Sequence, residues 1–165
     1  EKKIGTKDEL HVITTQPNRY LTHSVKAENQ ELKGKITIHR ISVPAHRNSM
    51  ISQAYTFIVF AFSAFILCRK VKPDFIIGTT SRLMTGVLTW ISARFQRRKY
   101  YIDLRDIFSE TISDLFALKN SFLSAFFRRL FSFLDKQVLN SAVGVNVVSE
   151  GFLEYFEKKG IKHEF

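Results

Sequence analysis

Two polar turns in the sequence carry the side chains best suited to bind a ligand. The first follows the apolar run Phe75–Ile77 and opens with Gly78, a residue that lets the backbone turn sharply or approach a ligand closely. Hydroxyls and free backbone N–H groups then stand where the next helix would begin, and the residues concerned are Thr79, Thr80, Ser81 and Arg82. The same segment also fits an ordinary strand-to-helix turn capped by a Ser or Thr hydroxyl.

The second turn, Arg105–Glu110, follows another strand-like run, Lys99–Leu104. In an open α/β sheet, ligands bind at the carboxyl ends of the strands. Because both turns would stand at such ends, the charges of Arg105, Asp106 and Glu110 are expected to face the same crevice as the first turn.

The elements that would position these turns alternate between strand and helix. Strands are expected at Leu10–Thr14, Ile36–Ile41, 74–78, Lys99–Leu104 and Val143–Val148. Helices are expected over 50–70, 83–95, about 122–140 and 149–159, whereas residues 21–34 indicate a loop or a short, weak helix. The alternation predicts an α/β fold of one domain over residues 1–165, with a mostly parallel sheet, helices on both faces and right-handed crossovers.

Charge and composition narrow the classes of partner. The formal net charge is +10 and the pI about 9.9, which favours nucleic acid, phosphorylated small molecules or an acidic membrane surface. Cys68 is the only cysteine, so neither a disulfide framework nor a Cys-x-x-Cys metal site is expected, and a reducing compartment fits best. The histidines show no i,i+4 pairs, and we therefore predict no metal site.

Apolar character is concentrated in two Phe-rich helical stretches. The run Ala54–Cys68 is somewhat shorter than the roughly 20 residues that span a bilayer, so a buried or interfacial helix is favoured over a transmembrane one. The second stretch, Phe122–Lys136, places Arg128 and Arg129 beside many Phe residues and is typical of a helix at an anionic interface. The alternative is that its Phe side chains fill the core.

Several short motifs, by their order and spacing, resemble those of bacterial glycosyltransferases of the family 4 type. The motifs are Gln16–Tyr20, Val43–Met50, Lys72–Asp74, Gly78–Gly86, Leu104–Ile107 and Val148–Phe152. The likeness is to the fucosamine-transferase-like branch, which builds O-antigen and capsule polysaccharides, and it extends from Leu10 to Ile161.

The resemblance implies the GT-B architecture, in which two Rossmann-like domains face each other across a cleft. It places this chain in the N-terminal, acceptor-binding domain, a three-layer Rossmann-like unit without its first strand and glycine-rich loop. The C-terminal domain, which holds the nucleotide sugar, has no counterpart before Phe165, so we expect no resident cofactor and no transfer by this chain alone. The implied acceptor is a polyprenyl-diphosphate-linked sugar at the inner face of the bacterial plasma membrane, in lipopolysaccharide or capsule biosynthesis, with no nucleic-acid partner.

The resemblance also implies roles for the polar turns. Sugar transfer requires a stabilised diphosphate leaving group and an acceptor hydroxyl aimed at the anomeric carbon. Asp106 would orient or partly deprotonate that hydroxyl, and Arg105 would hold Asp106 ionised or meet a phosphate. Glu110 would bind a hydroxyl of the acceptor sugar. The residues that would border the acceptor are Thr79, Thr80, Ser81, Arg82, His46 and Asn48.

Alternatives stay open on the sequence alone. Arg105 and Asp106 also fit a pair that only fixes the loop and caps the following segment. A non-hydrolysing sugar-nucleotide epimerase shares the two-domain architecture, although Pro17–Tyr20 and the Arg-Asp pair argue against it. A basic nucleic-acid module would interleave cations with exposed aromatic residues on one face, whereas the charges in this sequence are scattered.

Overall fold

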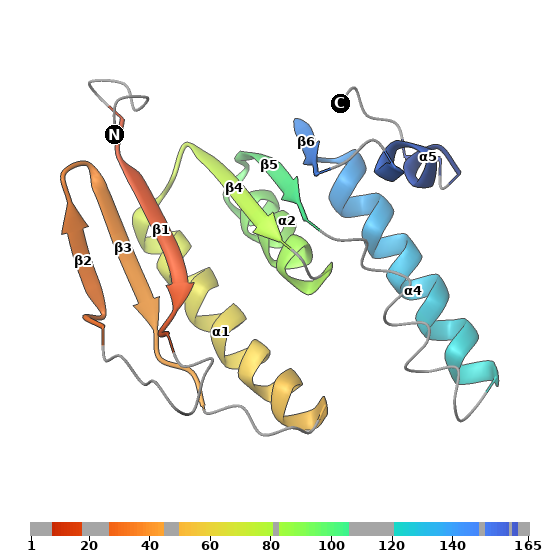
Figure 1. Cartoon of the computed structure of the whole chain (residues 1–165), viewed down its shortest axis with the longest axis horizontal. Helices are drawn as coiled ribbons and strands as arrows, with labels where there is room; N and C mark the ends of the chain where they lie inside the picture. The colour runs from red at the N-terminus through yellow and green to blue at the C-terminus, as the bar shows by residue number, and fades with distance from the viewer. Residues whose placement is uncertain are drawn as a thin grey trace. The chain divides into compact units, whose positions relative to one another are not determined.

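The computed structural model describes residues 8–17, 27–44, 50–80, 83–105, 121–148, 151–158 and 160–161 (Figure 1). Its contacts divide the chain into two compact units, Glu1–Val71 and Lys72–Phe165, and each unit is described by itself. Both units are mixed α/β structures.

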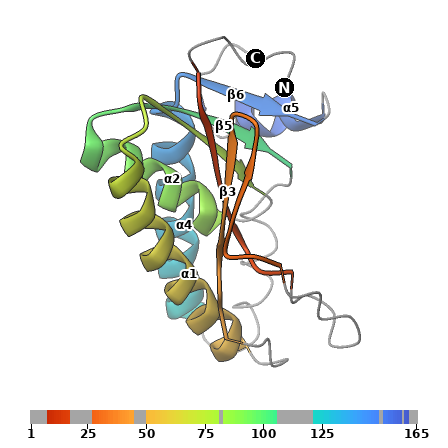
Figure 2. The ribbon, with the colours of Figure 1, turned by 90° about the vertical axis from the view of Figure 1, so that its left-hand side faces the viewer.

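The first unit contains the strands β1 (Leu10–Thr15), β2 (Gln30–Lys33) and β3 (Ile36–Ile41) and the helix α1 (Met50–Val71). The strands form a three-stranded sheet in the order β1-β3-β2, in which β3 pairs parallel with β1 and antiparallel with β2. Figure 2 shows α1 running along one side of this sheet. The strands predicted at Leu10–Thr14 and Ile36–Ile41 are thus confirmed.

The prediction of a loop or weak helix over 21–34 is wrong at its end, where β2 and β3 form a hairpin. The turn between them contains Gly34, whose φ of 60° is in the left-handed region that glycine adopts without steric cost. The sequence Gln30–Lys33 is polar because β2 is the outer strand of its sheet and has only β3 as a neighbour. Charged side chains are a common feature of such edges, and they hide the strand signal.

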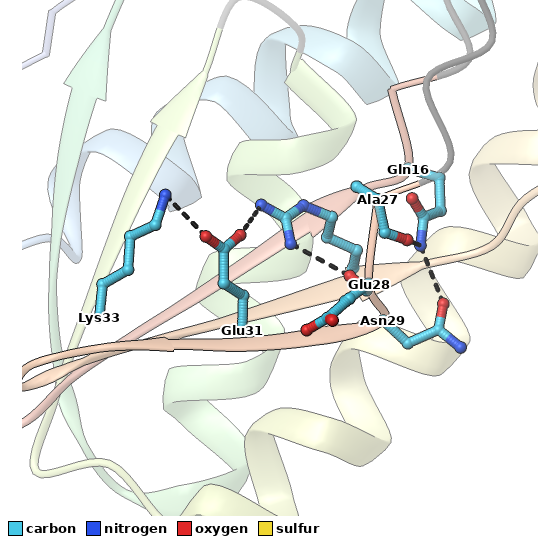
Figure 3. A network of polar contacts seen from close by, with 7 residues as sticks. Gln16, Ala27, Glu28, Asn29, Glu31 and Lys33 are labelled. Carbon is cyan, nitrogen blue, oxygen red and sulfur yellow. Dashed lines mark hydrogen bonds and ion pairs between the residues drawn. The ribbon is translucent and has the colours of Figure 1, made fainter.

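A polar network fixes this hairpin (Figure 3). Glu31 accepts from Lys33 across 2.7 Å and also pairs with Arg40 of β3, whose guanidinium donates to the carbonyl of Glu28. The hydrogen bond from Lys33, followed by that from Arg40, lowers the pKa of the Glu31 carboxyl. Gln16 donates to the Ala27 carbonyl, and so ties the end of β1 to the segment that enters β2. The network therefore sets the register of an edge strand that has no apolar pattern to set it.

Two imidazoles pair on the neighbouring strands β1 and β3. His11 Nδ1 and His39 Nε2 lie 3.0 Å apart, so one nitrogen must donate and the other must accept. Glu9 lies 3.9 Å from the other ring nitrogen of His11. Burial, followed by the charge of His11, lowers the pKa of His39 below its ordinary value.

We expect this histidine pair to make stability depend on pH. Because the pKa of His39 is lower in the folded state, the unfolded chain binds the proton more readily, and stability falls as the pH drops through and below about 6.5. Denaturant unfolding at a series of pH values should show a smaller loss for His39→Gln than for the parent chain. His11→Gln should also reduce the loss, and equal losses in all three proteins would contradict the assignment.

Helix α1 confirms the predicted long apolar helix and leaves much of it exposed. Among its described side chains, Thr56, Ala64 and Cys68 are buried. Its exposed apolar side chains are Tyr55, Ile58, Phe62 and Ile66. The part from Ser52 to Val71 is long and apolar enough to cross a membrane, a criterion of length and composition that core helices of soluble proteins also meet.

The second unit alternates strand and helix throughout. Its elements are β4 (Phe75–Thr80), α2 (Leu83–Gln96), β5 (Lys99–Leu104), α4 (Ser121–Asn140), β6 (Gly144–Val147) and α5 (Gly151–Lys158). The strands form a parallel sheet in the order β4-β5-β6. Parallel strand pairing and the predicted helices are confirmed in this unit. β4 extends to Thr80, two residues past the predicted end of the strand, so Thr79 and Thr80 belong to the strand and not to a turn.

The core of the second unit lies on one face of its sheet. Tyr100, Ile102 and Leu104 of β5 are buried there and pack in one cluster with Leu83 of α2 and Val138 of α4. The Tyr100 hydroxyl donates to the Val138 carbonyl over 2.6 Å, and burial raises the pKa of Tyr100 to about 12. Because the buried hydroxyl is hydrogen-bonded, its burial costs little stability, and the bond fixes the position of α4 relative to β5.

Two glycines allow the close packing of this layer. A Cβ at Gly86 would lie 3.1 Å from Val138 Cγ1, so the absence of a side chain at this position lets α4 approach α2 closely. Gly78 lies inside β4, where a Cβ would meet the side chain of Thr89 in α2. Of the two roles expected for Gly78, the sharp turn is therefore wrong, because Gly78 lies within the strand and permits its contact with the helix.

Helix α2 ends with a residue that is strained in its place. Arg97 has a φ of 53°, and its N–H donates to the carbonyl of Arg94, while Arg98 N–H donates to that of Ala93. This is the Schellman arrangement, in which glycine is the favoured residue at the left-handed position. Gly160 ends α5 with the same pair of bonds and a φ of 64°.

We expect Arg97→Gly to raise the free energy of unfolding by about 0.5–1 kcal/mol, because glycine removes the clash of Cβ with the backbone. Thermal or urea unfolding measures this gain. Arg97→Ala is the matched control, since it removes the same charge and keeps the Cβ. A gain of equal size in both variants would assign the effect to charge repulsion instead.

Candidate functional site: a polar row at the carboxyl ends of parallel strands

The structure places three of the residues predicted to form the site. Thr79 and Thr80 are the last residues of β4, and Arg105 follows β5 directly. The other predicted site residues lie outside the described part of the chain, and they are Asp106, Glu110, Ser81, Arg82, His46 and Asn48. The predicted approach of Asp106 to Ser81 therefore stays a prediction.

Neighbouring strands of the second unit bring three polar side chains into one row. Thr79 of β4 is paired in register with Asp103 of β5, and Asp103 with Asn146 of β6. Paired residues of parallel strands project to the same face of a sheet. The buried residues Ile102 and Leu104 alternate with Asp103, so the row occupies the face opposite the core.

Asp103 is the centre of this polar row. Asn146 Nδ2 donates to Asp103 Oδ1 over 2.8 Å, and Arg105 Nε donates to Asp103 Oδ2 over 3.1 Å. The Thr79 side chain also hydrogen-bonds to the carboxylate. These donors, with Asn146 first, lower the pKa of Asp103 against the opposing effect of burial. Asp103 is therefore ionised over the physiological range.

The arrangement suits binding better than proton abstraction. A carboxylate that accepts several hydrogen bonds and has a lowered pKa is a weak general base. Asp103 instead accepts a hydrogen bond from Arg105 Nε, and the Arg105 side chain, whose guanidinium carries further N–H donors, is 62% exposed. Guanidinium, amide and hydroxyl groups in one row can hydrogen-bond a sugar hydroxyl or a phosphate oxygen.

Thr79 and Thr80 have different surroundings. Thr79 is exposed in the polar row, while the side chain of Thr80 is buried on the core face. The Thr80 carbonyl accepts the backbone N–H of Arg105 over 2.9 Å and so continues the pairing of β4 and β5 past the end of β5. Thr80 thus fixes the backbone at Arg105, and Thr79 is the residue of the pair that can meet a ligand on the open face.

The open face around the row is apolar toward the other end of the strands. Phe75 and Ile77 precede Thr79 on the same face of β4, and both are exposed. Tyr101 lies beside Ile77 in register and is partly buried. A flat apolar and aromatic surface next to hydrogen-bonding groups is the usual composition of a site that binds sugar rings or a small organic ligand.

Sequence reasoning missed Asp103 and Asn146. Both lie within strands, whereas the residues predicted to bind a ligand lie in or near the turns that follow strands. The signal was the alternation in Lys99–Leu104, which sets Asp103 apart from its apolar neighbours. In the described part of the chain, no group of three or more His, Cys, Asp and Glu side chains is placed to hold a metal ion.

Comparison with known proteins adds no family assignment. A scan of protein-family models gave no match to this chain. A search of curated proteins also gave none.

Proposed function

We propose that this chain is the acceptor-binding domain of a glycosyltransferase that moves a sugar from a nucleotide sugar to a lipid-linked glycan. The observation that carries the proposal is the row Thr79–Asp103–Asn146 with Arg105 at the carboxyl ends of parallel strands. Ligands of open α/β sheets bind at this end. The motifs that resemble family 4 glycosyltransferases support the same assignment, because two of them, Gly78–Gly86 and Leu104–Ile107, adjoin the row.

The proposal includes the finer architecture. The chain would form the three-layer Rossmann-like N-terminal half of a GT-B enzyme, and the nucleotide sugar would bind mainly in the C-terminal half. The acceptor would be a sugar linked to polyprenyl diphosphate, used for lipopolysaccharide or capsule at the inner face of the plasma membrane. The net charge of +10 supports an anionic acceptor of this kind.

Each group of the row has a task in this scheme. Arg105 would bind an oxygen of the acceptor diphosphate or a sugar hydroxyl, with Asp103 keeping its guanidinium in place. Thr79 and Asn146 would hydrogen-bond sugar hydroxyls, which fixes the orientation that transfer requires. Asp106, next to Arg105 in the chain, is proposed to orient the attacking hydroxyl.

Binding by the chain as it stands tests the proposal. A short-chain prenyl diphosphate linked to an N-acetylated sugar is titrated by calorimetry, beside the same sugar without the diphosphate, a nucleotide sugar and random single-stranded DNA. The proposal expects the diphosphate-linked sugar to bind most tightly. Tighter binding of the nucleotide sugar would favour the epimerase, and tighter, strongly salt-dependent binding of DNA would favour the nucleic-acid module.

A further inference from the structure

The outer face of α4 has a composition that its place on the core does not explain. Phe131, Leu134 and Val138 pack into or against the core cluster of the second unit. The opposite side exposes Phe126 and Phe133, each 56% accessible, although packing does not require an apolar side chain at either position. Figure 1 shows α4 as one long helix, Ser121–Asn140.

Spacing gathers the exposed residues on one stripe. Phe126, Leu130 and Phe133 follow at intervals of four and three, which places them on one face of a helix. Arg129 and Lys136 are also exposed, and each is three residues after an exposed Phe. We define these five residues as the α4 stripe. The alternative that the Phe side chains of this helix fill the core is therefore wrong at Phe126 and Phe133, which are exposed.

The charge of the stripe has one sign. Asp135 is the acidic residue of α4, and it is buried on the other side. Among the exposed α4 side chains that the structure describes, Arg129 and Lys136 are the charged ones. The stripe thus presents aromatic and aliphatic groups flanked by cations, without a carboxylate to repel an anionic surface.

We infer that the α4 stripe docks the protein on an anionic lipid surface. Phe and Leu side chains would enter the boundary between headgroups and acyl chains, while Arg129 and Lys136 extend along the helix to lipid phosphates. The inference deepens the proposed function, because a docked domain would meet an acceptor whose prenyl chain stays in the membrane.

A second copy of the chain fits this surface less well. In a symmetric dimer the same patch would meet itself, and the cations of the stripe would approach the cations of the partner without acidic residues to pair with them. A lipid surface supplies the missing negative charge. The partner class follows from this complementarity.

Vesicle flotation tests the inference with the chain as it exists. Vesicles of phosphatidylcholine alone are compared with vesicles that also contain phosphatidylglycerol. We expect the parent chain to bind the anionic vesicles at least about tenfold more tightly. Arg129→Gln with Lys136→Gln should weaken this binding about thirtyfold, since one cation near an anionic surface contributes roughly fivefold. Phe126→Ser with Phe133→Ser should weaken it on the order of tenfold or more.

Matched controls remove the same groups elsewhere. Lys70→Gln with Lys99→Gln changes the net charge equally, and Phe62→Ser removes an exposed Phe of α1. Both should leave vesicle binding within about twofold. Circular dichroism checks the fold, and the cation variant decides the matter if the Phe variant fails to fold.

Several results would overturn the inference. Equal binding to both vesicle types, an equal loss in the Lys70/Lys99 control, or a greater loss in Phe62→Ser would each do so. A dimer that dissociates in Phe126→Ser would show that a second copy covers the stripe. Because acceptor binding is measured without vesicles, its failure is distinguishable from the failure of membrane docking.

Discussion

Replacing Gly78 with alanine is expected to destabilise the second unit by about 1–3 kcal/mol, the usual cost of overpacking. The added Cβ would collide first with Thr89 Oγ1, and it would also lie 2.9 Å from Thr89 Cγ2, a distance that real Cβ contacts essentially never show. Thr89 cannot retreat, because it is buried and its hydroxyl donates to the Thr85 carbonyl within α2. Strand and helix would have to separate, and urea unfolding measures the loss.

The double variant Gly78→Ala with Thr89→Ala identifies the cause. Thr89→Ala alone should cost less than about 1 kcal/mol, because alanine is the better helix former and the lost hydroxyl bonds only within the helix. In the double variant, most of the stability lost through Gly78→Ala should be recovered. Gly86→Ala is the control, and should change stability by about 1 kcal/mol or less, since the gain in helix propensity offsets the 3.1 Å contact with Val138. Additive losses at Gly78 and Thr89 would refute the contact.

The local sequence pattern predicted most strands and helices, because each contains a characteristic spacing of apolar residues. The parallel strands of the second unit are apolar runs bounded by Gly, Pro or polar turns, and the helices repeat apolar residues at helical spacing. The strand β2 was missed because Gln30–Lys33 is polar and pairs on one side only. Its position is fixed by Arg40 of β3, which pairs with Glu31, and by Gln16, which bonds the segment that enters β2, and neither residue belongs to the strand itself.

The orientation of α4 shows a second limit of sequence patterns. Phe126, Leu130 and Val138 fit one apolar face by spacing, yet only Val138 is buried. Phe-rich helices have more apolar residues than one face can hold, so periodicity does not decide which of them meets the sheet. Two contacts at Val138 fix which face of α4 meets the sheet. Gly86 leaves space for the Val138 side chain, and the Tyr100 hydroxyl donates to the Val138 carbonyl.

The candidate site could be predicted only in part for the same reason. Thr79 and Arg105 were found because they stand at the ends of apolar runs. Their connection through Asp103 and Asn146 depends on the register of three strands that are separated by helices. Register is a property of the assembled sheet, and a single strand does not encode it.

The polar row leads to a prediction on ligand affinity. Arg105→Ala is expected to weaken binding of the prenyl-diphosphate sugar on the order of tenfold or more, because hydrogen bonds to charged groups contribute about 1.5–3 kcal/mol. Calorimetric titration gives the affinity. Since Arg105 is largely exposed, its removal should leave thermal unfolding nearly unchanged.

Asp103→Asn separates the positioning of Arg105 from direct contact. Without its carboxylate partner the guanidinium gains freedom, so affinity should fall by less than in Arg105→Ala, and the two variants combined should lose little more than Arg105→Ala alone. Lys99→Ala is the matched control, because Lys99 is an exposed cation at the opposite end of β5. If Lys99→Ala weakened binding as much as Arg105→Ala, general charge would explain the affinity. If Lys99→Ala keeps the parent affinity while Arg105→Ala loses it, the ligand binds at the carboxyl ends of the strands, where Asp103 holds Arg105, the one cation of the polar row.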